Sequence, residues 1–284
     1  MRGDPQRAGP CYLVRVVVVS ALYVYPVKSC RGIRVRQWPV AARGFAADRR
    51  WMIVDASGRF VTQRELAQLA LVSTELEGEQ LRLRAPGRSE LVLPLRHEIG
   101  EPREVQVWED RALGMVHAVG STWFSRYLGA PHELVYMPDH HLRQVNPARA
   151  RLGDITSFAD AYPFLLLSEA SLADLNSRLD DPITMERFRP NIVISGCEPF
   201  AEDGYARVRI GEISFRGPKR CDRCVITTVD PLTGERGPEP LRTLAKYRLA
   251  DQKVWFGMNL IHDQTGVLRV GDAVAPSGHN MSCR

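Results

Sequence analysis

Two cysteines that could do chemistry lie close together in the stretch "FRGPKRCDRCVITTVDPLTGER". Cys221 and Cys224 are separated by Asp222 and Arg223, which is the spacing of a C-x-x-C pair. Thiols at this spacing occur in zinc sites, in redox dithiols and in disulfides. They also occur as inert side chains in a turn, so the spacing alone leaves four interpretations open.

The zinc and redox interpretations each need features that the sequence lacks. A structural zinc site has four ligands, but there is no second C-x-x-C pair and no His-x(3–5)-His pair. His262 and His279 could contribute ligands, although nothing in their spacing places them beside the cysteines. A redox dithiol normally follows a thioredoxin-like βαβ pattern, which is absent here. Both interpretations are less favoured than inert thiols in a turn, and both stay open.

Basic residues surround the pair, because Cys221 follows Lys219 and Arg220, and Cys224 follows Arg223. Positive charge nearby stabilises a thiolate, and a thiolate is a soft ligand for a transition metal. We expect Cys224 to open a strand, "CVITTVD", that would hold its side chain rigidly at a barrel rim. One thiolate in such a setting could anchor an anionic metal cofactor that supplies most of its own ligands.

The elements that must position these residues are mostly short strands and turns. From residue 12 to about residue 135, apolar runs alternate with turn signals in "WMIVDASGRFVTQ", "LRLRAPGRSELVLPL" and "EVQVWED". The apolar run "YLVRVVVVSALYVYP" is too short to span a bilayer and predicts a buried strand. One helix is expected at "STWFSRYLG", with Ser121 as its N-cap and Gly129 just past its end.

A domain boundary is predicted at residues 137–154, where "MPDHHLRQVNPARARLGD" is polar and weakly periodic. The segment "FLLLSEASLADLNSRLDDP" predicts a strand that runs into a helix capped by Ser168. Leu172, Leu175 and Leu179 share one face of that helix. "NIVISG" then predicts a short buried strand.

The C-terminal part predicts a hairpin, a long turn, a helix and a last strand. The hairpin is "ARVRIGEISFRG", whose Gly-Glu turn suits type II′. The long turn is "DPLTGERGPEP", the helix is "EPLRTLAKYR" and the strand is "GVLRVGDAV". Many short strands with few helices indicate an α+β chain that is predominantly β, folded as barrels or sandwiches. There is no G-x-G-x-x-G motif and no P-loop, so nucleotide binding of those kinds is not indicated.

Composition narrows the class of protein. The 284 residues suggest one large or two ordinary domains, and 44% hydrophobic with 25% charged residues is typical of a globular chain. The net charge is +5, but the arginines are spread along the chain, which argues against a nucleic-acid-binding arm. Six sparse cysteines in so long a chain favour reduced thiols and a cytoplasmic location. Residues 1–11 are expected to be a disordered leader.

Six stretches in a fixed order carry a resemblance to a known family. They are "YPVKSC" (25–30), "DRRW" (48–51), "PFLLLSEASLADLNSRL" (163–179), "FRPNIVISGCEPFAED" (188–203), "CDRCVITTVDPLTG" (221–234) and "EPLRTLAKYR" (239–248). With them the chain resembles the MOSC-domain molybdenum enzymes, specifically the mitochondrial amidoxime-reducing component and its bacterial relatives. The resemblance implies an N-terminal β-rich MOSC domain over residues 12–137. It implies a MOSC β-barrel domain with a few short helices over residues 145–280.

The resemblance also implies one molybdenum cofactor, a pyranopterin (Mo-molybdopterin), bound between the domains. The cofactor dithiolene gives two sulfurs to the metal, and by motif Cys224 is the protein ligand that gives a third. Cys197, in "ISGC", is not the ligand by this match, and we interpret it as a small buried side chain. Cys221 is a neighbour without an assigned role.

Further cofactor contacts follow from the same motifs, because a phosphate and a polar pterin need cations and fixed donors. The implied cofactor-binding residues are Lys28, Ser29, Arg49, Asp160, Ala161, Tyr162, Arg189, Asn191, Asp222, Arg223, Cys224 and Asn259. Taken singly, Lys28 could instead be a solvated turn residue and Arg49 a surface ion-pair partner. Arg189 lies beside a buried strand, so we expect it to need an anionic partner.

Three of these positions depart from the family pattern. Ala161 and Tyr162 stand where small hydroxyl residues are expected, and Asn259 stands where the mitochondrial enzymes carry an aromatic residue. Hydroxyl contacts to the cofactor at the first two positions are therefore in doubt. The shape of the substrate pocket is expected to differ near Asn259.

The activity implied by the resemblance is two-electron reduction of N-hydroxylated compounds, namely amidoximes, hydroxylamines and N-hydroxylated bases. Cys224 would tune the metal, and Asp160 would be a catalytic residue that shuttles a proton or orients the N–OH group. The alternatives are a molybdenum-cofactor carrier without turnover and a non-enzymatic zinc-binding β-protein.

A separate electron donor is implied as well. A plant-type iron–sulfur module needs a C-x(4)-C-x(2)-C cluster, and after Cys224 only Cys283 remains. A cytochrome b5-like protein, or a ferredoxin with its reductase, is the expected partner. We expect no membrane anchor and no nucleic-acid partner.

Overall fold

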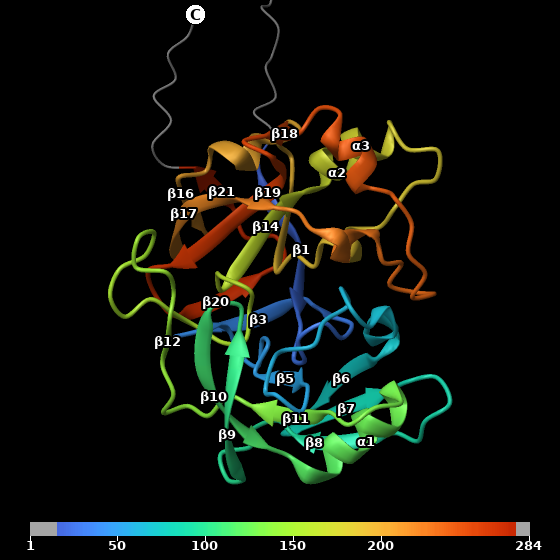
Figure 1. Cartoon of the computed structure of the whole chain (residues 1–284). Helices are drawn as coiled ribbons and strands as arrows, with labels where there is room; N and C mark the ends of the chain where they lie inside the picture. Colours follow the sequence, from blue (N-terminus) through green and yellow to red (C-terminus); the bar gives the residue numbers. More distant parts are fainter. Residues whose placement is uncertain (1–15, 277–284) are drawn as a thin grey trace, which may run out of the picture.

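The computed structural model describes residues 16–276, which form two halves stacked one above the other (Figure 1). The upper half in that view is built around a nine-stranded sheet, and the lower half around smaller sheets. Strands predominate and the α-helices are short, which confirms the predicted fold class. The expected leader, residues 1–11, lies outside the described residues.

The large sheet joins the first strand of the chain to the C-terminal half of the sequence. Its order is β2-β1-β15-β14-β19-β17-β16-β21, and β18 pairs with β19. The strands are β1 (Val18–Val24), β2 (Ile33–Val35), β14 (Phe164–Ser168), β15 (Ile192–Ser195), β16 (Arg207–Ile210), β17 (Ile213–Asp222), β18 (Leu249–Ala250), β19 (Lys253–His262) and β21 (Val274–Pro276). Leu22 of β1 lies opposite Ile192 of β15. This pairing joins β1 and β2 to strands that all come from the second half of the sequence. The domain limits stay a prediction.

The burial of strand β14 explains why residues 164–167 form a continuous apolar run. Both of its faces are covered, because Phe164 and Leu166 pack into one core cluster and Leu165 and Leu167 into another. The second cluster includes Leu175 of helix α2 (Glu169–Asn176). A strand covered on both faces has no solvent side on which polar residues would be favoured.

The lower half contains a four-stranded and a three-stranded sheet. The first runs in the order β5 (Trp51–Val54), β11 (Glu133–Tyr136), β10 (Asp110–Val116) and β9 (Glu101–Val107), and the second in the order β6 (Ser73–Glu77), β7 (Gln80–Arg84) and β8 (Leu91–Pro94). Trp51, Phe124 and Tyr136 are among its fully buried side chains. The segment 51–63 has one strand rather than the predicted two, since its second arm makes only isolated bridges, from Phe60 to Val54 and from Arg59 to Gln106.

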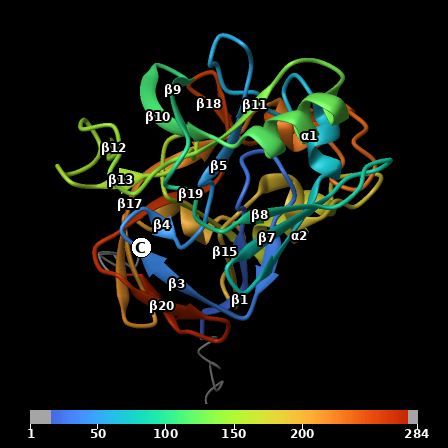
Figure 2. The ribbon, with the colours of Figure 1, turned by 90° about the horizontal axis from the view of Figure 1, so that it is seen from below.

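Two small sheets complete the strand inventory. They are β20 (Gly266–Arg269), β3 (Gln37–Ala41) and β4 (Gly44–Phe45) in one, and β12 (Arg143–Gln144) with β13 (Ile155–Thr156) in the other. The β12–β13 arm projects at the edge of the molecule in both ribbon views (Figures 1 and 2). The predicted last strand, "GVLRVGDAV", is in fact two strands, β20 and β21, because the chain turns at 270–273.

The expected helix at "STWFSRYLG" exists but begins earlier than predicted. Helix α1 (Ala118–Leu128) has His117 as its N-cap, and Nδ1 of His117 accepts a hydrogen bond from the Gly120 amide at 3.0 Å. Ser121 was wrong as the N-cap, because its hydroxyl donates to the His117 carbonyl and accepts from the Leu134 amide. Gly129 ends the helix as predicted, with φ 76°.

The other helices are short. They are α2 (Glu169–Asn176) and α3 (Leu241–Ala245), with the 3-10 helices η1 (Ala67–Leu71), η2 (Met185–Phe188), η3 (Ala201–Gly204) and η4 (Val225–Thr228). Ser168 caps α2 as predicted, and its hydroxyl accepts from the Ser171 amide. Leu179 lies beyond the end of α2, so only Leu172 and Leu175 lie on the helix itself. No helix within residues 16–276 is long and apolar enough to cross a membrane.

The predicted hairpin at residues 206–217 is confirmed. Ile210 of β16 pairs with Ile213 of β17, which leaves Gly211 and Glu212 as a two-residue turn. Gly211 has φ 57°, while Glu212 has no positive φ, as a type II′ turn requires. The hairpin positions the C-x-x-C segment, because β17 contains Cys221 and ends at Asp222.

Candidate functional site

One cavity, of about 890 Å³, collects the candidate residues from both halves of the sequence. All of the implied cofactor-binding residues line it, namely Lys28, Ser29, Arg49, Asp160, Ala161, Tyr162, Arg189, Asn191, Asp222, Arg223, Cys224 and Asn259. The structure therefore brings the set together, while the individual roles stay a prediction. Cys221 lines the same cavity.

Cys224 lies at the start of a 3-10 helix and not at the start of a strand, so that expectation was wrong. It is the N-cap residue of η4, just after β17 ends at Asp222. Its carbonyl accepts hydrogen bonds from the amide and the hydroxyl of Thr227, at 3.2 and 3.0 Å. The tight turn that follows a long strand still gives the thiol a fixed position.

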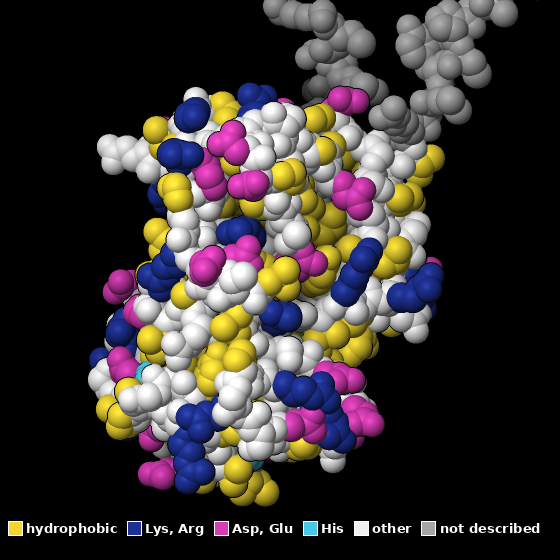
Figure 3. Space-filling model, turned by 90° about the vertical axis from the view of Figure 1, so that its right-hand side faces the viewer, with side chains coloured by type: hydrophobic (Ala, Val, Ile, Leu, Met, Phe, Trp, Pro, Cys, Tyr) yellow, Lys and Arg dark blue, Asp and Glu magenta, His cyan; other side chains and the backbone are white. Residues whose placement is uncertain are grey.

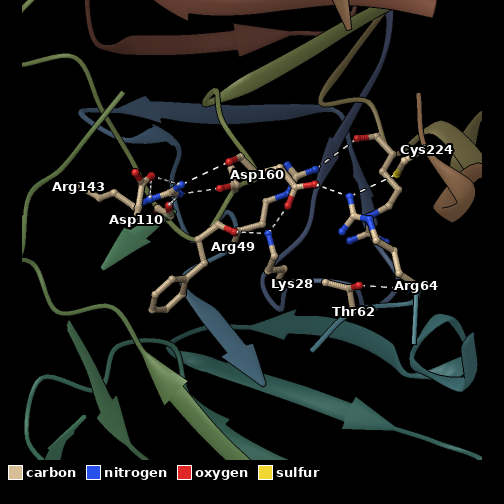
Figure 4. Close-up of polar contacts among 12 residues, drawn as sticks. Lys28, Arg49, Thr62, Arg64, Asp110, Arg143, Asp160 and Cys224 are labelled. Carbon is tan, nitrogen blue, oxygen red and sulfur yellow. Dashed lines mark hydrogen bonds and ion pairs between the residues drawn. The ribbon is translucent and has the colours of Figure 1, made fainter. Parts of the chain in front are cut away.

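The Cys224 thiol and the Asp160 carboxylate share one arginine (Figure 4). The Nη2 atom of Arg64 donates to Sγ of Cys224 at 3.2 Å and to Oδ2 of Asp160 at 3.1 Å. The Arg64 backbone is held by a turn in which Oγ1 of Thr62 accepts from the Arg64 amide at 3.1 Å. Sequence reasoning missed Arg64, because nothing local in "FVTQRE" distinguishes it from a surface arginine.

Asp160 is also paired with Lys28. The Nζ atom of Lys28 lies 2.5 Å from Oδ1 of Asp160 and donates to the Phe158 carbonyl at 2.7 Å. Burial lowers the pKa of Lys28 to about 8, although the Asp160 charge opposes this. Burial alone would raise the pKa of Asp160, but the charges of Lys28 and Arg64 hold it well below its usual range. Lys28 is buried, so it is not the solvated turn residue of the alternative interpretation.

Arg49 makes an ion pair, but a buried one. Its Nη1 atom donates to Oδ2 of Asp48 at 2.6 Å and to Oδ1 of Asn191 at 3.0 Å. Asn191 also donates to the Tyr23 carbonyl and to Asp48, and its Oδ1 accepts from the Leu165 amide. The amide of Asn191 is thus occupied by protein groups, and it orients Arg49 toward the cavity.

Arg189 is half-buried without a carboxylate bonded to it among the described residues. Its Nη1 atom donates to the Cys30 carbonyl at 2.6 Å, and its guanidinium stacks 4.4 Å from the centre of the Tyr25 ring. Burial lowers the pKa of Arg189 to about 10. Its Nη2 atom has no hydrogen-bond partner among residues 16–276. The anionic partner expected for Arg189 is therefore not supplied by the described chain.

Two other cavity arginines also have a buried nitrogen without a partner in the described part of the chain, Nη1 of Arg64 and Nε of Arg223. The remaining donors of Arg223 bond the Phe188 carbonyl at 2.7 Å and Sγ of Cys221 at 3.0 Å. Burial raises the pKa of the Cys221 thiol, which Arg223 partly offsets. An unpaired buried donor is unfavourable, so this cavity is suited to an anion-bearing ligand.

Charge counts agree with that conclusion. Seven cationic side chains line the cavity against four carboxylates; the cations are Lys28, Arg49, Arg64, Arg143, Arg189, Lys219 and Arg223. On the outer face shown in Figure 3, basic and acidic side chains are interspersed. Phosphate and pterin groups of the implied cofactor fit the lining of the cavity.

The remaining predicted residues lie on β17, on its neighbour β19 and just before β14. Asp222 closes β17 and pairs with Lys219 at 2.8 Å and Lys253 at 3.2 Å. Asn259 lies on β19, where its Nδ2 atom donates to the Arg220 carbonyl at 3.4 Å. Ala161 is exposed and Tyr162 is half-buried.

Backbone strain gathers at the cavity. Ser29, Arg49, Trp108 and Arg189 all line it and have φ of 68°, 48°, 56° and 56°. For residues other than glycine this left-handed conformation costs on the order of 1–3 kcal/mol each. Such positions persist where the surrounding structure determines them, which is common at functional sites. Sequence patterns do not reveal them.

Arg143 is a second residue that sequence reasoning missed. It is buried, and its guanidinium bonds Asp110 at 2.7 Å and the carbonyls of Ser157 and Ala159 at 2.9 and 2.6 Å (Figure 4). It lies in the polar stretch at residues 137–154 that predicted a domain boundary, where an arginine is expected to be exposed. The contacts fix the backbone that leads to Asp160.

The cysteines and candidate metal ligands do not form a protein-only metal centre in the described range. Within residues 16–276, no group of three or more His, Cys, Asp or Glu side chains is arranged to hold a metal ion. Cys30, Cys197, Cys221 and Cys224 are free thiols. Cys197 is partly buried against the core of the large sheet, close to its interpretation as a small buried side chain.

Comparison with known proteins matches two parts of the chain to family models. Residues 16–131 match the model described as the MOSC N-terminal beta barrel domain, and residues 154–275 match the MOSC domain. Mitochondrial amidoxime-reducing component 1 of Homo sapiens is 36% identical, covering 92% of this chain and 83% of that protein. Mitochondrial amidoxime reducing component 2 of Rattus norvegicus is 37% identical, covering 92% and 84%.

Among solved structures, the YUAD protein from Bacillus subtilis covers 91% of this chain and 94% of its own at 12% identity, with a TM-score of 0.42. The sequence relatives carry the argument instead, because their identity extends over nearly the whole chain. The two matched models also cover most of the residues. The resemblance seen in the motifs is thereby confirmed: this chain belongs to the MOSC-domain family, together with the mitochondrial amidoxime-reducing components.

Proposed function

We propose that this protein is a molybdenum-cofactor-dependent reductase of N-hydroxylated compounds such as amidoximes, hydroxylamines and N-hydroxylated bases. Membership of the family makes a function related to the molybdenum cofactor, and an oxidoreductase activity, the broad assignment. The names of the relatives describe reduction of amidoximes by those proteins. The substrate class is carried to this chain as a proposal.

The observation that carries the proposal is the Cys224 thiol at a cavity that is suited to an anion. Cys224 would supply the thiolate ligand, and the unpaired nitrogens of Arg64, Arg189 and Arg223 would face the phosphate and pterin groups. When bound, the cofactor would supply the two-electron redox chemistry, while the protein binds, orients and polarises.

The net reaction converts an N–OH group into N–H and water, and it consumes two electrons and two protons. Asp160 is held as a carboxylate by Lys28 and Arg64, so it accepts a hydrogen bond from the N–OH hydrogen and does not itself carry the proton at neutral pH. Lys28, 2.5 Å away and with a pKa of about 8, is the proposed source of a proton beside Asp160. Of the two roles expected for Asp160, shuttling a proton or orienting the N–OH group, the proposal assigns it the second and assigns the proton to Lys28.

Electrons come from a separate redox protein in this proposal. The sequence contains no plant-type iron–sulfur cysteine cluster, and a cytochrome b5-like protein or a ferredoxin with its reductase is the proposed donor. Reconstitution with either donor and an electron source would test this step by itself.

The deciding experiment is benzamidoxime reduction by purified protein of known molybdenum content, with reduced methyl viologen as the electron source. We expect benzamidine to form at a rate proportional to bound molybdenum. Full molybdenum occupancy without benzamidine would contradict reductase activity and favour a cofactor carrier. Zinc in place of molybdenum would contradict both.

A further inference from the structure

The hairpin between β9 and β10 presents a tryptophan and a glutamate to the cavity. Val107 pairs with Asp110, so Trp108 and Glu109 form the two-residue turn, and both line the cavity. Trp108 has φ 56°, in the region where such turns favour Asn, Asp or Gly. A bulky residue is unfavourable there, so the geometry of the turn does not account for the tryptophan.

The Trp108 ring is held in place but left partly open. The Arg64 guanidinium lies over one face of the ring, 4.6 Å from its centre, and the centre of the Phe60 ring is 5.1 Å away. Trp108 is nevertheless 44% exposed, whereas Trp51 and Trp123 are 1% and 8% exposed. The exposed part of the indole lines the cavity, where a planar group of a ligand could pack against it.

Glu109 differs from its neighbours in having no ion-pair partner among residues 16–276. Asp110 pairs with Arg143, and Glu104 on the facing strand pairs with Arg111. Glu109 is exposed at the cavity, beside the open ring of Trp108. A carboxylate repels the anionic groups to which the rest of the lining is suited, so its place fits a cationic part of a ligand.

We propose that Trp108 and Glu109 form the substrate-selecting rim of the cavity. The indole packs against a planar aromatic group, and the carboxylate accepts N–H hydrogen bonds from a cationic nitrogen group. The ligand class is planar amidines and guanidines, with their N-hydroxylated forms. The inference rests on the proposed function, because N-hydroxylated amidines and amidines are a substrate and product of that reaction.

Three small ligands separate the two contacts by calorimetric titration of the full chain with its cofactor content quantified. Benzamidine has a ring and a positive charge, acetamidine has only the charge, and benzamide has only the ring. In Trp108→Ala we expect binding of benzamidine and benzamide to weaken about five- to ten-fold and acetamidine less than two-fold. Trp108→Phe keeps a ring and should restore most of the loss.

In Glu109→Gln we expect benzamidine and acetamidine to bind about five- to ten-fold more weakly, with benzamide changed less than two-fold. Leu152→Ala is the matched surface control, because Leu152 is 98% exposed and does not line the cavity. Wild-type protein that binds no benzamidine overturns the rim assignment. Equal losses for all three ligands, or none, overturn it as well.

The failure of this inference is distinguishable from failure of the proposed function. If benzamidoxime is not reduced but the ligand pattern holds, the reductase assignment fails and the rim assignment stands. If benzamidoxime is reduced but neither variant discriminates among the ligands, the reductase assignment stands and the rim assignment fails.

Discussion

Arg64 donates a hydrogen bond to Sγ of Cys224 at 3.2 Å although 160 positions separate the two residues in the sequence. The same nitrogen holds Asp160 at 3.1 Å. One guanidinium from the first half of the chain thus joins the candidate metal ligand to the candidate proton-handling carboxylate. Each of these groups yields a prediction.

Replacing Arg64 should impair turnover through both of its partners. We expect Arg64→Ala to lower kcat for benzamidoxime at least about ten-fold, because two charge-assisted hydrogen bonds are lost together. Arg64→Lys should recover little, since an ammonium lacks the planar fork that reaches two acceptors and stacks on a ring. Arg59→Ala, at a half-exposed arginine nearby, is the control. Unchanged kinetics of purified Arg64→Ala would contradict the role.

Cys224 should be required for molybdenum binding and for turnover. In Cys224→Ala we expect no benzamidine formation and a molybdenum content well below that of wild type, because the protein ligand is gone. Elemental analysis and the reduction assay measure the two effects separately. Cys197→Ala removes a partly buried thiol elsewhere and should keep both. An active, molybdenum-loaded Cys224→Ala would refute the assignment.

Lys28 should leave a signature in the pH dependence of stability. Its pKa is lowered from 10.5 to about 8 on folding, so the folded state binds this proton less tightly than the unfolded state. The free energy of unfolding contributed by Lys28 therefore rises as the pH goes from 8 to 10.5, by up to about 3 kcal/mol.

Urea denaturation at several pH values in that window would measure the effect, as the difference between wild type and Lys28→Gln. Lys253→Gln serves as a half-exposed lysine control. Parallel curves for wild type and Lys28→Gln across the window would show that burial does not shift the proton affinity of Lys28.

Arg143 should be a stability residue as well as a support for Asp160. Its side chain is 4% exposed, so Arg143→Met leaves Asp110 and buried carbonyls without their donor. We expect a loss of about 3–5 kcal/mol in the free energy of unfolding, from chemical denaturation. Arg111→Met breaks an exposed ion pair on β10, the strand of Asp110, and should change the free energy of unfolding by less than about 1 kcal/mol. Similar losses in both variants would contradict the buried role.

Local features were predictable from the sequence, because they depend on residues within a few positions of one another. Ser168 as a helix cap, Gly129 as a helix end and Gly211 in the hairpin turn were all read correctly. The predictions that were wrong also concerned local structure, where two neighbouring residues or two conformations were both possible. His117 replaced Ser121 as the cap of α1, and the β-branched residues after Cys224 form a 3-10 helix although their propensity favours a strand.

The sequence by itself determined the family, the mostly β fold and twelve of the residues that line the cavity, because these depend on ordered motifs and on the periodicity of apolar residues. Tertiary structure alone decided how those residues meet. Arg64 and Arg143 have no local signal, and their partners depend on strand pairing such as that of β1 with β15. The strained φ of Trp108 and the unpaired nitrogen of Arg189 likewise arise from packing between distant segments, which no short window of sequence contains.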